Sequence, residues 1–85
     1  MQRFYFNVYD HVECIDEEGQ LAADLSAARD LALESVRALA CEQICSGYLH
    51  LDDYLVVTDA DGLELLTVSF GEGLEIRGGP AGKPR

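Results

Sequence analysis

The feature that most constrains the fold of this sequence is a single helix-length run of apolar residues near its centre. Asp24 can cap the first turn of a helix, and Gly47 can take the left-handed conformation that ends one. Between them, apolar side chains recur on one arc at helical spacing: Leu25, Ala28, Ala32, Val36, Leu39 and Ala40, with Leu33 and Ile44 at its edges. A helix with one apolar arc must pack against another layer, so residues 25–45 predict a helix lying on a sheet.

Strands are predicted on both sides of this helix. Residues 3–10 alternate, so that Phe4, Phe6 and Val8 share the buried face of a strand. The other segments with strand or turn signals are residues 12–16, the turn 16–19, residues 54–58, the turn 59–62, residues 63–70 and a short edge segment at 74–77. The resulting order, β-β-α-β-β, predicts an α+β domain with one helix packed on one face of a mainly antiparallel sheet.

The second face of that sheet is the predicted interaction face. It carries Tyr5, Asn7 and Tyr9, because these residues alternate with the apolar ones along the first strand. One helix covers only one face, and tyrosines tolerate water but also suit interfaces. Simple exposure, self-association and ligand binding all remain open for this face.

The charge of the sequence is strongly uneven. The formal net charge is -10, and all sixteen acidic residues precede Arg77, where only Arg3, Arg29 and Arg37 oppose them. Such a body repels phosphate backbones and anionic lipid heads, so neither nucleic acid nor a membrane surface is an expected partner. A basic protein or a cation suits this charge better. Self-association is the other expected partner, because of the small core and the second sheet face and not because of the charge.

The length and the cysteine content of the sequence indicate how many domains it forms and in which compartment it is expected. We expect one domain over residues 1–77, followed by a flexible Gly/Pro-rich basic tail at 78–85. A chain of 85 residues has a small core that gains from a partner. The sequence lacks a run of about 20 apolar residues and a signal-peptide pattern, and it has an odd number of cysteines, so a cytoplasmic protein with reduced thiols is expected.

The cysteines suggest an alternative function. Cys41 and Cys45 lie side by side on the predicted helix because of their i,i+4 spacing. With Cys14, His11 and His50 they could supply the sulfur and imidazole ligands of a tetrahedral zinc site. The sequence has no CxxC knuckle, however, and no cofactor is expected in the leading interpretation. A third hypothesis is a small enzyme that uses a carboxylate, which would need that group in an apolar pocket.

Five short motifs stand in order between residues 3 and 70. They are Arg3-Phe4-Tyr5-Phe6, Asp16-Glu17-Glu18-Gly19, Asp24-Leu25-x-Ala27-Ala28-Arg29, Val57-Thr58-Asp59-x-Asp61-Gly62 and Leu66-Thr67-Val68-x-Phe70. Together they resemble a family of short bacterial proteins known only as a domain of unknown function. The resemblance implies no activity, substrate or site, and the cysteines lie outside its motifs. The leading hypothesis is a non-catalytic protein-interaction module, with a homodimer as one form of it, and it rests on the acidic surface, the small core and the polar-aromatic second face of the sheet.

Overall fold

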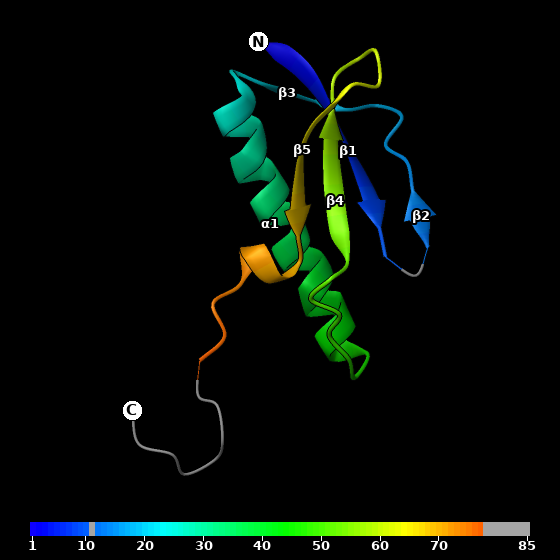
Figure 1. Cartoon of the computed structure of the whole chain (residues 1–85), viewed down its shortest axis with the longest axis vertical. Helices are drawn as coiled ribbons and strands as arrows, with labels where there is room; N and C mark the ends of the chain where they lie inside the picture. The colour runs from blue at the N-terminus through cyan, green and yellow to red at the C-terminus, as the bar shows by residue number, and fades with distance from the viewer. Residues whose placement is uncertain (11, 78–85) are drawn as a thin grey trace.

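The structure, a computed structural model, describes residues 1–10 and 12–77 and has an α+β fold (Figure 1). Its elements are, in order, β1 (Gln2–Tyr9), β2 (Glu13–Cys14), β3 (Gln20–Ala22), α1 (Leu25–Cys45), β4 (Tyr54–Thr58), β5 (Glu64–Ser69) and the 3-10 turn η1 (Gly71–Gly73). The strands form one antiparallel sheet in the order β2-β1-β4-β5, and β3 also pairs with β1. The predicted fold class is confirmed, and the predicted tail at 78–85 lies outside the described residues.

The sheet is organised around β1, which pairs on both of its edges. One edge pairs with β4, where Tyr9 lies opposite Tyr54. The other edge is shared, because β3 pairs with the start of β1 and β2 pairs with its end. The segment that connects β2 to β3, residues 15–19, lies outside the sheet. Residues 20–22 were missing from the predicted strands, since three residues are too few for an alternating pattern to be recognised.

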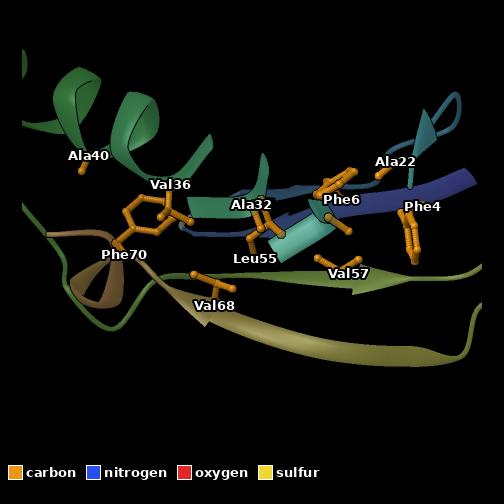
Figure 2. Packing of buried hydrophobic residues seen from close by; sticks show 11 residues of the cluster. Phe4, Phe6, Ala22, Ala32, Val36, Ala40, Leu55, Val57, Val68 and Phe70 are labelled. Carbon is orange, nitrogen blue, oxygen red and sulfur yellow. The ribbon is translucent and has the colours of Figure 1, made fainter. Parts of the chain in front are cut away.

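The core lies between α1 and the face of the sheet that carries Phe4 and Phe6 (Figure 2). The helix has the predicted bounds, and Asp24 caps it by accepting a hydrogen bond from the backbone N–H of Ala27 at 2.8 Å. The fully buried side chains of the core include Ala28, Ala32, Val36, Leu55, Val57, Val68 and Phe70. Small alanines on the helix and larger side chains on the strands therefore bring the two layers close together.

The predicted apolar arc of the helix is wrong at its two ends. Leu25 is 40% exposed and Ile44 is 58% exposed, whereas Gln43 is 5% exposed. The last turns of α1 run beyond the strands, so Ile44 has no sheet to pack on (Figure 1). Gln43 is buried instead by the segment that returns from α1 to β4.

The chain after β5 also differs from the prediction. Residues 74–77 form no edge strand, and η1 turns the chain back against α1. The Nε of Arg37 donates to the carbonyl of Gly73 at 2.7 Å. A Cβ on Gly73 would lie 2.6 Å from Cγ2 of Val36, so the absence of a side chain allows this close approach.

Candidate functional site

The tyrosine face, defined here as Tyr5, Tyr9 and Tyr54, lies on the side of the sheet opposite α1. Tyr5 and Tyr9 are half-buried on β1, as the alternation predicted. Tyr54 on β4 is 40% exposed and stacks on Tyr9, with ring centroids 5.3 Å apart and an angle of 21° between the rings. Tyr54 was not among the predicted residues of this face, although its alternation with Val56 along β4 places it there.

Asn7, the third predicted residue of this face, is only 8% exposed. Its Oδ1 accepts a hydrogen bond from the backbone N–H of Asp16 at 2.9 Å. The side chain therefore holds the segment between β2 and β3 against the sheet. The tyrosines therefore supply more of the accessible surface of this face than Asn7 does.

Carboxylates surround the tyrosine face. Partial burial is the main cause of a raised pKa at Tyr9, and the charges of Glu13 and Glu64 raise it further. A hollow of about 400 Å³ lies over this part of the sheet, and its lining includes Tyr5, Tyr9, Asp59 and Glu64. The face therefore combines aromatic rings with a negative potential, and that combination suits a cationic side chain.

The carboxylate of Asp16 holds the segment between β2 and β3 through three hydrogen bonds from backbone N–H groups. It accepts from the backbone N–H groups of Phe6 at 3.1 Å, Glu18 at 3.1 Å and Gly19 at 3.0 Å. Partial burial raises its pKa, but these three hydrogen bonds lower it by more, so the net pKa is below its usual value. A general acid needs the opposite shift, so Asp16 is suited to holding the loop and not to proton transfer.

Three of the five family-like motifs have structural roles at turns or at the helix cap. Gly19 has a φ of +71°, and a Cβ there would lie 2.8 Å from the carbonyl oxygen of Phe4. Oδ1 of Asp59 accepts from the N–H groups of Asp61 and Leu63, which closes the hairpin between β4 and β5. Together with the Asp24 cap and the Asp16 loop, these contacts explain those three motifs as determinants of folding.

The arginines of the folded body do not neutralise its carboxylates. Arg3 donates through Nη1 to the carbonyl of Glu18 at 2.8 Å, and Arg37 donates to the carbonyl of Gly73. Among the described residues, the one ion pair between an arginine and a carboxylate joins Arg77 to Glu75, at 3.0 Å. The acidic surface is therefore largely uncompensated.

The proposed metal ligands are spread over the fold. Cys14 lies on β2, whereas Cys41 and Cys45 lie on α1, and all three are exposed free thiols. In the part of the chain that the structure describes, no group of three His, Cys, Asp or Glu side chains is placed so that it could hold a metal ion. His11 lies outside that part.

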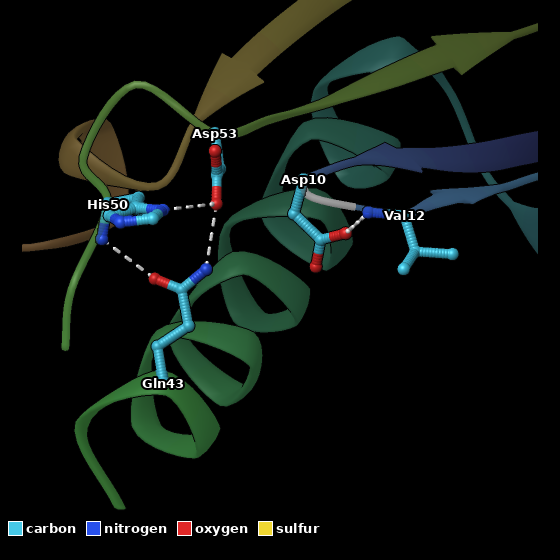
Figure 3. A network of polar contacts seen from close by, with 5 residues as sticks. All are labelled: Asp10, Val12, Gln43, His50 and Asp53. Carbon is cyan, nitrogen blue, oxygen red and sulfur yellow. Dashed lines mark hydrogen bonds and ion pairs between the residues drawn. The ribbon is translucent and has the colours of Figure 1, made fainter. Parts of the chain in front are cut away.

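His50 belongs to a polar network centred on Gln43 (Figure 3). The Nε2 of Gln43 donates to Oδ2 of Asp53 at 2.8 Å, and its Oε1 accepts from the backbone N–H of His50 at 2.8 Å. The Nδ1 of His50 lies 3.7 Å from the same carboxylate oxygen of Asp53. These contacts fix the segment between α1 and β4 on the helix, so the network satisfies the buried amide of Gln43.

A groove runs along the flank of α1, where the segment from β2 to β3 leaves the sheet. It consists of a hollow of about 730 Å³ and a second hollow of about 580 Å³, which share Ala38 and Leu39 as lining residues. Apolar side chains line the first hollow, among them Phe6, Val8, Ile15, Leu39 and Leu55. The second extends to Cys45 and Tyr48. We call the two together the helix-flank groove.

No helix of the described chain combines the length and apolar character needed to cross a membrane. No curated protein and no solved structure matches the sequence. Residues 3–71 match the family described as Domain of unknown function (DUF6894), in agreement with the resemblance carried by the five motifs. This match covers most of the chain, and the protein is a member of the DUF6894 family.

Proposed function

We propose that this chain is a non-catalytic module that binds a basic protein through the tyrosine face. The observation that carries the proposal is the stack of Tyr9 on Tyr54, flanked by Glu13 and Glu64, on a sheet face opposite the helix. Arginine and lysine side chains pack on aromatic rings and pair with neighbouring carboxylates. This face offers both groups within one surface.

The uncompensated charge of the body supports a basic partner over a second copy. Arg3 and Arg37 are engaged by backbone carbonyls, which leaves most carboxylates without a cation. A negative surface accelerates encounter with a positive partner and opposes association of two identical acidic chains. Self-association is therefore the alternative that the test must distinguish.

Titration of the isotopically labelled chain with an arginine-rich peptide tests the proposal. Amide resonances of Tyr5, Tyr9 and Tyr54 should shift, and an acidic peptide of equal length should shift none of them. Replacing Tyr54 by Ser should weaken binding by about threefold to tenfold, which corresponds to one cation–π contact, whereas Tyr54→Phe should retain it.

Ile76→Ser is the control, because Ile76 is exposed and lies outside the tyrosine face. Shifts that miss the tyrosines would contradict the proposed face. Native mass spectrometry of the free chain gives the oligomeric state, and a stable dimer that buries the tyrosines would overturn the proposal in favour of self-association.

A further inference from the structure

We propose that the helix-flank groove holds one bulky apolar side chain from a segment of the basic partner, with cationic residues of that segment beside it. The inference rests on the proposed function for the charge of the partner. It adds a second contact of different chemistry, an apolar anchor, on a surface separate from the tyrosine face.

The lining of the groove is suited to an apolar anchor. Phe6 and Leu55 belong to the core, yet both also line the first hollow, so the groove reaches the edge of the hydrophobic layer. The opening exists because the edge of β1 that faces away from β4 lacks a strand partner between its pairings with β2 and β3. At this gap the Asp16 carboxylate accepts the N–H of Phe6. On the helix side, Ser35 and Ala38 leave room that larger side chains would fill.

The rim of the groove is acidic. Glu17 and Glu18 border the first hollow and Glu42 borders the second, and all three are exposed. Their carboxylates make no hydrogen bond or ion pair with any described residue. The described lining contains no lysine, arginine or histidine. An apolar floor between carboxylates at both ends favours an apolar residue flanked by cations.

Two other occupants fit this chemistry less well. A second copy would bring its own carboxylates to the acidic rim, and like charges repel. The tail of the same chain, residues 78–85, supplies Lys83 and Arg85, but its remaining residues are glycine, proline and alanine. The tail therefore has no bulky apolar side chain to serve as the anchor.

The three cysteines provide a direct readout of occupancy. Cys14 lines the first hollow, and Cys41 and Cys45 line the second. All three thiols are exposed in the free chain, so they should react readily with iodoacetamide. A segment bound in the groove would cover them, whereas a ligand on the tyrosine face would leave them open.

The experiment uses the full chain and two synthetic peptides. One carries a tryptophan between arginines, and the other carries serine in place of the tryptophan. We expect the tryptophan peptide to bind about tenfold more tightly, since burial of an aromatic side chain supplies at least that difference. It should also slow the alkylation of Cys14 severalfold, as measured by mass spectrometry of the digested protein.

Matched variants locate the anchor. Ala38→Arg places a cation and a long side chain in the groove and should abolish the preference for tryptophan. Ser26→Arg makes the same charge change at an exposed helix residue outside both hollows, and should retain the preference. Circular dichroism and thermal unfolding confirm that each variant is folded before binding is compared.

The outcomes separate the two proposals. Equal affinity of both peptides, with shifts at the tyrosines and no protection of Cys14, would overturn the groove as an anchor site and leave the proposed function intact. Failure of both peptides to bind at low ionic strength would overturn both. Tryptophan-dependent protection of Cys14 that is lost in Ala38→Arg would support the groove.

Discussion

The carboxylate of Asp16 accepts the backbone N–H of Phe6 at 3.1 Å, in the gap where neither β2 nor β3 pairs with β1. The side chain thus replaces a missing strand, and it also accepts from the N–H groups of Glu18 and Gly19. The segment between β2 and β3 can therefore leave the sheet while the backbone N–H of Phe6 keeps a hydrogen-bond partner.

Asp16→Ala is predicted to destabilise the fold by about 1–3 kcal/mol, the cost of leaving such donors without a partner. Urea unfolding at neutral pH measures the change in free energy. Asp61→Ala is the matched control, because the Asp61 carboxylate is exposed and accepts no hydrogen bond from a described residue. Equal losses in the two variants would contradict the role given to Asp16.

The stabilisation by Asp16 is predicted to depend on pH. Its pKa is lowered in the folded state, because hydrogen bonds from Gly19, Phe6 and Glu18 together outweigh the effect of partial burial. The unfolded chain, with an aspartate pKa of about 3.9, therefore binds the proton more readily, and acid favours unfolding. The contribution is complete above about pH 5 and is lost as the pH falls through the folded pKa.

Urea unfolding of the wild type and Asp16→Ala over this pH range provides the test. The difference in free energy of unfolding between the two proteins should be constant near neutral pH and should shrink below about pH 4. A difference that grows in acid would have the wrong sign for a lowered pKa.

Gly73→Ala is predicted to destabilise the packing of η1 on α1. The new Cβ would lie 2.6 Å from Cγ2 of Val36, a fully buried side chain, so one of the two elements must move. Overpacking of this kind costs about 1–3 kcal/mol. In Gly71→Ala the nearest atom, Cβ of Leu51, is 3.4 Å away, so that variant should lose less stability in thermal unfolding. A larger loss in Gly71→Ala would contradict this account.

The local patterns in the sequence predicted most of the fold because each has a local physical cause. The alternation around Phe6 predicted β1, and Asp24 and Gly47 predicted the ends of α1. The predictions failed where the cause is tertiary. Nothing local distinguishes Gln43 from a solvent-exposed polar residue, although it continues the spacing of Val36 and Ala40. Its burial depends on Asp53 and His50, which arrive from another part of the chain.

The candidate surfaces were predicted less completely than the fold. Alternation placed Tyr5 and Tyr9 on one face, but the stack with Tyr54 depends on the register between β1 and β4. The helix-flank groove was not predicted. It exists because the chain leaves the sheet around Asp16, and no periodic pattern in a sequence encodes a gap between two pairings of one strand.

The pKa of Tyr9 is predicted to report the negative potential of the tyrosine face. Partial burial is the largest cause of the raised pKa of Tyr9, and the charges of Glu13 and Glu64 raise it further. Glu64→Gln removes one charge and should lower the pKa of Tyr9 toward its ordinary value of about 10. Titration of the assigned tyrosine ring resonances measures the shift. Glu72→Gln is the control, since Glu72 is not among the charges acting on Tyr9. If neither Glu64→Gln nor Glu13→Gln lowered the pKa of Tyr9, these carboxylates would not act on this face, and the main argument for a cationic ligand there would be lost.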